Sequence, residues 1–542
     1  MKKIFVSTLL ISAAVALQAQ TGDLGNQQLY YKRFQTAENT FHKVLQQDPN
    51  NAGNWYSLIK TYLLEDKLAK AADTIQYVPD NIKSDPYLKV AMGSIALQEG
   101  KNDEANNYFN EAIKDTREKN AGVLSAVAES NIIAKNGDAN FAIDALNKAI
   151  KRDKKNAALY VLLGDAYRNL QNGSEAFKAY QKAIDLNDKE ADAYYDLGQI
   201  FLSQKNTELY LENFNKAIGA DPNYAPALYQ LYVYEFYHDP VKAMDYYKKY
   251  MNNSDASIQN QYDLADLLYI SKQYPQAVEK ANEIVKEEGD KAQPRLYKLI
   301  GYSLAAQKDT ARAIGFMQQY FEKAPDSIFI AKDYITMGQL YSSMPQQDSL
   351  AMVYFEKAVT VEKDSSQLIN DYKRLAELSA ASKNYSAQAK WLGKYYTANS
   401  EATNLELFNW ALAHFRAEEY AQADSVFGLY VAKYPDQSFG YYWQAKAKAL
   451  QDKEMKDGLA VPAYEKLVEV LQKNPSDPNY KKWLVESYGY LAAYEVNTKK
   501  DYAEAVDYFE KVLQVDPDNA DAKKYISVLQ KNNTNSTDSG SK

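Results

Sequence analysis

Side chains that carry acid–base, metal or nucleophilic chemistry are scarce in this chain. Its 542 residues include no Cys and three His, so thiol nucleophiles, thiolate metal sites and disulfides are excluded. The three histidines, His42, His238 and His414, lie far apart in the sequence, which argues against a shared metal or general-base site. The G-x-S-x-G, P-loop and G-x-G-x-x-G patterns are absent. We therefore expect no catalytic residues, no metal and no cofactor, and the chain is predicted not to be an enzyme.

The net charge of the chain argues against one class of partner, nucleic acids. The chain carries 63 Lys and Arg against 71 Asp and Glu, a formal net charge of −8. A general nucleic-acid binder needs a basic face that displaces counterions from phosphates, so we expect no nucleic-acid partner. With 46% hydrophobic residues, 25% charged residues and only 21 Gly and 15 Pro, the composition is typical of a folded protein with few long linkers.

The N-terminus has the pattern of a secretory signal. Two lysines, Lys2 and Lys3, precede an apolar run at residues 4–17, and Ala19 supplies a small residue before Gln20. We expect a signal peptide over residues 1–19, with cleavage after Gln20 and a buried N-terminal helix as alternatives. No later segment has the roughly 20 consecutive apolar residues of a membrane span. The two-lysine start looks bacterial, so we expect a periplasmic protein whose association with an outer-membrane complex is peripheral.

A repeat of about 34 residues organises the rest of the chain. Residues 156–190 align with residues 191–225. The matching pairs are Tyr160/Tyr194, Leu163/Leu197, Gly164/Gly198, Tyr167/Phe201, Tyr180/Phe214 and Ala183/Ala217. Similar patterns recur along nearly the whole chain, which predicts about fourteen units, each too small to bury its apolar face alone.

These units resemble the tetratricopeptide repeat (TPR), in which a large residue, Leu-Gly and an aromatic mark the first helix. Ala, an aromatic and Ala mark the second, and Pro often follows. The resemblance implies an all-α fold, a right-handed superhelical solenoid of helix-turn-helix repeats. We expect an N-terminal block at 20–254, a C-terminal block at 255–519 with a hinge near residue 255, a capping helix at 520–531 and a disordered tail at 532–542.

In this family, the position after the large core residue of each first helix lines a concave groove. Aromatic side chains dominate these positions, and such rings suit extended peptides or stacked sugar rings. The predicted partner groove consists of Tyr56, Tyr195, Tyr229, Tyr262, Phe408 and Trp443. The alternative is that these rings belong to the repeat core, because the chain has 47 Tyr in all.

Five three-residue segments of the chain are candidate glycosylation sites. Each has Asp, then Ser or Thr, then a small or aliphatic residue, and resembles the acceptor for O-linked glycosylation in some Gram-negative envelopes. The acceptor hydroxyls are Thr74, Thr310, Ser327, Ser349 and Ser425. Asp before Ser or Thr is also a common way to cap the start of a helix, so capping remains an alternative.

Taken together, these patterns predict a non-enzymatic periplasmic scaffold that binds partner proteins or peptides during envelope assembly or secretion. The alternative is a carbohydrate-binding envelope protein similar to the SusD-like glycan binders. Those proteins are normally anchored through a lipidated Cys, which this chain lacks, and much of their length is irregular. A repeat-bearing enzyme is the third class, and it would need a non-repeat segment of about 100 residues, the size of a catalytic domain.

Overall fold

The computed structural model describes residues 23–538, and side chains as far as residue 531. The predicted signal peptide at 1–19 lies outside the described residues. Between residues 23 and 538 every regular element is helical, with no β-strand. The predicted all-α solenoid of paired helices is therefore confirmed for this part of the chain. None of its helices is long and apolar enough to span a bilayer.

Each repeat is a pair of antiparallel helices joined by a tight turn. In the repeat that begins at residue 157, the turn residue Gln171 has a φ of 57°, the left-handed conformation that ends many helices. The next residue, Asn172, caps the second helix by accepting a hydrogen bond from the backbone N–H of Glu175 at 3.2 Å. Left-handed residues recur at the same turn in later repeats, at Lys205, Lys272, Lys308, Lys383 and Glu418.

The Gly of the repeat pattern lets the two helices of a pair approach closely. A Cβ at Gly164 would lie 2.4 Å from the ring of Tyr180, which is far inside van der Waals contact. Tyr180 and the flanking Ala176 and Ala183 are fully buried. The spacing of Gly, Ala and aromatic residues in the sequence is thus explained by the packing of one helix on the other.

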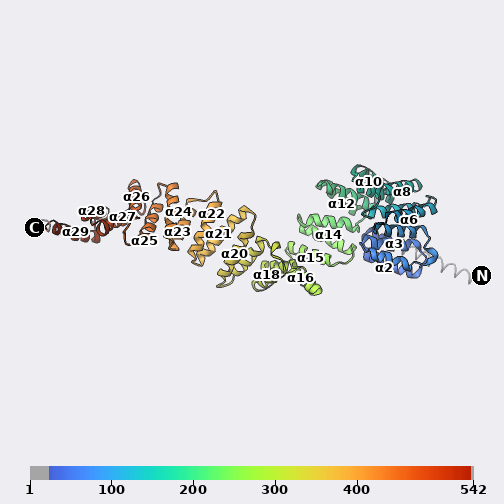
Figure 1. Cartoon of the computed structure of the whole chain (residues 1–542), viewed down its shortest axis with the longest axis horizontal. Coiled ribbons are helices and arrows are strands. Elements are labelled where there is room, and N and C mark those ends of the chain that lie inside the picture. Colours follow the sequence, from blue (N-terminus) through green and yellow to red (C-terminus); the bar gives the residue numbers. More distant parts are fainter. Residues whose placement is uncertain (1–22, 539–542) are drawn as a thin grey trace, which may run out of the picture. The chain divides into compact units, whose positions relative to one another are not determined.

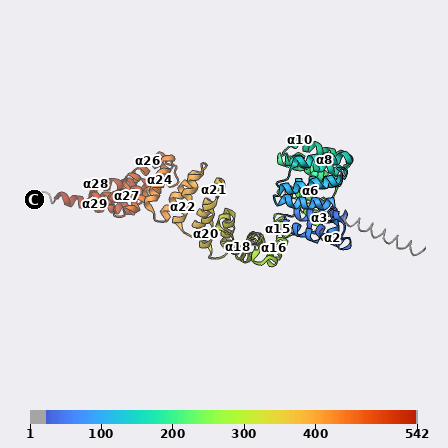
Figure 2. The same cartoon turned by 45° about the vertical axis from the view of Figure 1, so that its right-hand side comes forward.

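The described residues form two compact units that divide between Ala292 and Gln293. In the first unit the helices stack as successive layers, with α2 and α3, then α6, then α8 and α10 in order (Figure 2). Residues 23–30 are also helical. The further helices are α2 (Phe34–Gln47), α3 (Ala52–Leu64), α4 (Leu68–Thr74), α5 (Pro86–Gln98), α6 (Asn102–Asp115), α7 (Ala121–Ile133), α8 (Ala139–Arg152), α9 (Ala157–Asn169), α10 (Gly173–Leu186), α11 (Ala191–Ser203), α12 (Thr207–Ala220), α13 (Ala225–Phe236), α14 (Pro240–Asn253), α15 (Ile258–Ile270) and α16 (Tyr274–Glu288), with short turns η1 (Ile75–Tyr77), η2 (Asp80–Ile82) and η3 (Gly289–Lys291).

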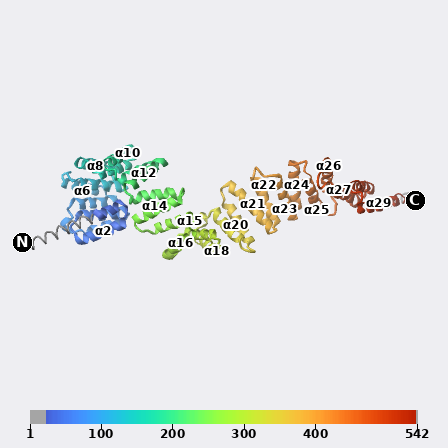
Figure 3. The same cartoon turned by 180° about the vertical axis from the view of Figure 1, so that it is seen from behind.

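In the second unit, helices α21 to α26 follow one another in chain order (Figures 1 and 3). The helices are α17 (Arg295–Ala306), α18 (Thr310–Lys323), α19 (Ala331–Ser342), α20 (Asp348–Val361), α21 (Ser365–Ala381), α22 (Tyr385–Ala398), α23 (Asn404–Arg416), α24 (Tyr420–Lys433), α25 (Ser438–Gln451), α26 (Val461–Lys473), α27 (Tyr480–Tyr494), α28 (Tyr502–Val515) and α29 (Ala520–Asp538), with η4 (Asp326–Ile328) and η5 (Glu495–Lys499). The helix expected at 520–531 is α29, which packs on α28 and extends to Asp538; residues 539–542 of the predicted tail lie outside the described residues. A helix propagates at low cost once it has formed.

In the first unit, the first repeat contacts repeats near the end of the same unit. The hydroxyl of Tyr31 donates a hydrogen bond to Asp221 at 2.8 Å, and the Tyr30 ring lies 5.1 Å from that of Tyr224. The carboxylate of Asp255 accepts hydrogen bonds from the start of α2, at 2.7 Å from the backbone N–H of Gln35 and also from the Thr36 hydroxyl. We call this set of interactions, between residues 30–36 and residues 221–255, the closure contact.

The closure contact explains why the boundary between the two compact units differs from the predicted hinge. The sequence places a hinge near residue 255, whereas the compact units divide between Ala292 and Gln293. Asp255 is bonded to the first repeat, so the segment around residue 255 is held inside the first unit. The residues that meet in the closure contact are about 190 to 220 positions apart in the sequence, so no local sequence pattern reveals it.

Candidate partner-binding surfaces

Two of the predicted groove tyrosines are buried in the first unit. Tyr56 is 7% exposed, and its hydroxyl donates to the carbonyl of Ala126 at 3.4 Å. Tyr262 is 1% exposed, and its hydroxyl donates to Glu288. Both rings therefore pack between neighbouring helices of the solenoid, as the repeat-core alternative supposed.

The other two predicted tyrosines of this unit are half-buried. The Tyr195 ring lies 5.6 Å from Phe214 and 5.7 Å from Tyr224, which places it next to the closure contact. The Tyr229 ring lies 5.1 Å from that of Tyr250. Each leaves only part of its ring accessible to a partner.

The two predicted aromatics of the second unit are also half-buried. Phe408 lies 5.6 Å from Phe427, and Trp443 lies 4.9 Å from Phe415. Both border the same core cluster, which is centred on Phe427 and Tyr430. The structure brings these two residues together, but mainly as packing between consecutive repeats.

The three histidines occupy separate environments, and no group of three or more potential metal ligands occurs among the described residues. His42 lies 2.9 Å from the Tyr62 hydroxyl. His238 stacks on Tyr234 at 4.1 Å. His414 lies 3.1 Å from the indole nitrogen of Trp410 on the same helix.

The five candidate glycosylation acceptors differ in accessibility. Thr74 is only 8% exposed, and its hydroxyl donates to the carbonyl of Lys70 at 2.7 Å. Thr310 is half-buried at the start of α18, where the preceding Asp309 caps the helix through the backbone N–H of Arg312. The remaining three, Ser327, Ser349 and Ser425, are exposed. Modification of these residues stays a prediction.

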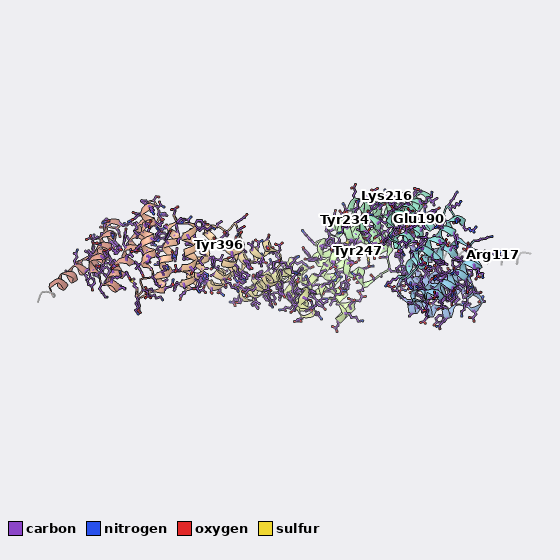
Figure 4. The ribbon with its side chains drawn as sticks, turned by 45° about the horizontal axis from the view of Figure 1, so that its top comes forward. Arg117, Glu190, Lys216, Tyr234, Tyr247 and Tyr396 are labelled. Atoms are coloured by element: carbon purple, nitrogen blue, oxygen red, sulfur yellow. The ribbon has the colours of Figure 1, made fainter. Side chains whose placement is uncertain are left out.

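In the first unit, several charged side chains on different helices are paired with one another. Lys60 lies 3.0 Å from Glu129, and Arg168 lies 2.5 Å from Asp196. Burial raises the pKa of Asp196 well above its usual range, and burial raises that of Asp192 to about 7. The carboxylate of Glu190, labelled in Figure 4, adds to the shift of Asp192. These carboxyl groups were not singled out from the sequence, where they resemble ordinary helix-surface residues.

A cleft of about 520 Å³ lies in the second unit, where α22 meets α21 and α23. Tyr372 of α21 lines the cleft, together with Trp410 and His414 of α23. The remaining lining comes from α22 and consists of Ala389, Lys390, Gly393, Lys394, Thr397 and Ala398. A Cβ at Gly393 would lie 2.9 Å from the Trp410 indole, so the absence of a side chain allows the indole to rest close to the α22 backbone.

A chain of hydrogen bonds fixes the Trp410 side of this cleft. The indole N–H of Trp410 donates to Nε2 of His414 at 3.1 Å. Because Nε2 accepts, the proton of the neutral ring is assigned to Nδ1, which lies 2.6 Å from Glu419. The hydroxyl of Ser386 donates to the other oxygen of Glu419 and, together with His414, lowers the pKa of that carboxyl. The aromatic wall is therefore held in one orientation.

The cleft lining contains two lysines and no carboxylate. Lys390 is paired with Glu356 at 3.2 Å. Lys394 has no carboxylate within ion-pair distance among the described side chains, and its ammonium lies 5.5 Å from the Tyr372 ring and 5.1 Å from the Trp391 ring. Beyond Trp410, Lys433 lies 3.2 Å from the hydroxyl of Tyr396, which is labelled in Figure 4. The surface thus combines positive charge with aromatic rings.

Sequence reasoning did not identify this cleft. One signal was available, because residues 378–400 contain three lysines and no Asp or Glu. However, its walls come from three helices, and Trp410 is 16 to 20 residues beyond the two lysines of the lining, Lys394 and Lys390. Only the packing of successive repeats shows that these residues share a surface.

Protein-family models of the TPR repeat match several parts of the chain. A model described as TPR repeat matches residues 164–205. Models described as tetratricopeptide repeat match residues 29–95, 191–224, 299–327, 407–436 and 490–519. No curated protein has a sequence significantly similar to this one.

Several solved structures match parts of this chain, with low TM-scores. The C-terminal part of a TPR repeat-containing protein from Cytophaga hutchinsonii is 25% identical, covering 49% of this chain and 99% of that one, with a TM-score of 0.28. A tetratricopeptide repeat protein from Parabacteroides merdae is 18% identical, covering 46% and 96%, with a TM-score of 0.28. YrrB, described as a TPR protein with an unusual peptide-binding site, is 18% identical, covering 35% and 96%, with a TM-score of 0.23.

Proposed function

Because the chain is a tetratricopeptide repeat protein, we propose that it is a non-enzymatic scaffold that holds partner proteins or peptides on the surfaces of its repeats. The repeat array carries this proposal: family matches are spread from residue 29 to residue 519, and helix pairs fill the chain between them. An extended array of stacked repeats offers a long surface, which suits recognition of other chains.

We place this scaffold in the periplasm of a Gram-negative cell, in envelope assembly or secretion. The support is the basic start and apolar run at residues 1–17 with Ala19 before Gln20. If the signal peptide is removed as expected, mass spectrometry of the protein from its own cells will find Gln20 at the N-terminus, in the periplasmic fraction. An intact Met1 in the cytoplasmic fraction would contradict this location.

The scaffold role is tested by reciprocal purification. The full chain is tagged in its own organism, cross-linked in intact cells and purified, and each candidate partner is then tagged and used to recover this chain. We expect at least one partner to be recovered in both directions, at a comparable molar amount, and to be absent from an unrelated exported protein with the same tag. The carbohydrate-binding alternative predicts no reciprocal protein pair, together with retention of the chain on envelope polysaccharide.

A further inference from the structure

We propose that the cleft between α21, α22 and α23 binds an acidic segment of a partner protein. In this arrangement a carboxylate of the partner lies between Lys390 and Lys394, and a neighbouring nonpolar side chain packs against Trp410. The proposal rests on the proposed scaffold function and names the chemistry of the partner that this site accepts.

Charge complementarity points to an acidic occupant. The lining contributes two ammonium groups from successive turns of α22 and no carboxylate. Lys394 has only aromatic neighbours at 5.1 and 5.5 Å, so a carboxylate would be its first ion-pair partner. The pair between Lys390 and Glu356 is largely exposed, with 53% and 41% of the two side chains accessible. Such exposed pairs contribute little to stability, so Lys390 is free to turn to a partner.

The walls of the cleft favour a nonpolar side chain beside the carboxylate. Trp410 of α23 and Tyr372 of α21 both line the cleft, and Ala389, Gly393 and Ala398 of α22 add little side-chain bulk to it. The hydrogen bonds from Trp410 to His414 and from His414 to Glu419 hold the indole in place before any partner arrives. A preformed aromatic wall reduces the ordering cost of binding, and Trp is a frequent centre of binding energy in protein interfaces.

The charged groups described above for the first unit differ from those of the cleft. In the first unit, the charged groups already satisfy one another, as in Lys60 with Glu129 and Arg168 with Asp196. A partner that drew away one member of such a pair would leave the other charge partly buried and unpaired, which is unfavourable. In the cleft of the second unit, binding an acidic segment adds pairs without removing buried ones.

The test uses the full chain and a synthetic peptide that alternates glutamate with phenylalanine, labelled with an uncharged fluorophore. Binding is measured by fluorescence anisotropy at low and at physiological salt. We expect saturable binding that weakens as salt rises. We also expect a loss of about tenfold or more in affinity for the Lys390→Glu/Lys394→Glu variant, because two attractive charge pairs become repulsive. A peptide with glutamine in place of glutamate should bind more weakly to the wild type.

A matched control keeps the result specific to the cleft. Lys482→Glu reverses an exposed lysine on α27 of the same unit, outside the lining, and should leave the affinity unchanged. Circular dichroism and thermal unfolding confirm that the variants keep the fold. Equal binding by the wild type and the double variant, or equal binding of the glutamate and glutamine peptides, would overturn the proposal. So would no binding of the glutamate peptide to the wild type.

The experiments distinguish failure of the cleft proposal from failure of the proposed scaffold function. If partners recovered by reciprocal purification are retained equally by the Lys390→Glu/Lys394→Glu variant, the scaffold function stands and the cleft proposal falls. If no protein partner is recovered in either direction, the scaffold function itself falls. Saturable binding of a small anionic aromatic compound at the cleft, with no binding of the glutamate peptide, would also overturn the partner named here.

Discussion

The two units are built from the same repeat but are held together in different ways. In the first, the closure contact joins the first repeat to residues about 190 to 220 positions later, through Tyr31 with Asp221 and Thr36 with Asp255. In the second, side-chain hydrogen bonds such as that of Tyr442 with Glu486, 44 residues apart, join neighbouring repeats. A stack held only by neighbours behaves as a one-dimensional array, whereas a non-local contact couples its ends. We therefore expect the first unit to unfold more cooperatively than the second.

The largest expected effect comes from truncating a buried ring in each terminal repeat. Phe41 in the first repeat is fully buried and Phe509 in the last is 9% exposed. Each Phe→Ala change should destabilise its unit by about 3–5 kcal/mol. Hydrogen exchange should rise near residues 191–255 as well as locally for Phe41→Ala, but only in the adjacent repeats for Phe509→Ala. Exchange that stays local in both variants would remove the distinction between the units.

A smaller effect is expected from breaking the closure contact directly. Asp255→Ala removes the acceptor of the Gln35 and Thr36 hydrogen bonds and should cost about 1–3 kcal/mol, the range for a lost charged acceptor that leaves donors unpaired. Denaturant unfolding measures the cost, and exchange at residues 34–37 locates it. Asp245→Ala, an exposed position on α14, is the control and should have little effect. If both variants behave alike, the closure contact contributes nothing to stability.

The next prediction concerns pH and applies to the first unit. Burial raises the pKa of Asp192 to about 7, from an ordinary value of 3.8. The folded state therefore binds more protons than the unfolded state between these values, so this residue's contribution to stability falls as pH rises from about 4 to about 7. Asp192→Asn should make unfolding of the first unit less dependent on pH over that range. An unchanged difference in midpoint between pH 4 and pH 7 would contradict the assignment.

The smallest effect is expected from the ion pair at the edge of the closure contact. Arg33 and Asp255 are 4.0 Å apart, with side chains 32% and 22% exposed. At 4.0 Å and with both side chains partly exposed, the pair should contribute about 0–1 kcal/mol, so Arg33→Ala should shift the unfolding midpoint far less than Asp255→Ala. The matched variant in the second unit is Lys446→Ala, which removes a pair with Glu486 at 2.7 Å. A loss from Arg33→Ala as large as that from Asp255→Ala would show that the ion pair, rather than the hydrogen bonds, holds the contact.

The repeat pattern predicted the helix pairs well because the residues that pack the two helices of a pair together lie close to one another in the sequence. The spacing of Gly164 and Tyr180 places a residue without a side chain beneath a ring, and both lie within one repeat. The groove aromatics were harder to assign. Tyr56 and Tyr262 occur at the positions that the repeat pattern assigns to the groove, but both are buried. Their burial depends on how successive repeats pack against one another, which the sequence of a single repeat does not specify.

The cleft proposed as a binding site lay beyond the reach of the same reasoning. Lys390 and Lys394 are one turn apart and visible in the sequence, but their partner in the cleft, Trp410, belongs to the next repeat. In isolation, two lysines on a helix describe a solvated surface. Their significance depends on the aromatic ring that the stacking of α22 and α23 places beside them.

The sequence by itself determined the all-α repeat architecture and the scarcity of catalytic chemistry, since both follow from residue types and from spacings within about 34 residues. Only the tertiary structure decided that Asp255 belongs with the first repeat, that Tyr56 and Tyr262 are buried while the other four predicted groove rings are half-buried, and that a cationic aromatic cleft exists in the second unit. The physical reason is that these features depend on the rotation between successive repeats. Small rotations accumulate over many units, and they bring together side chains that no local pattern connects.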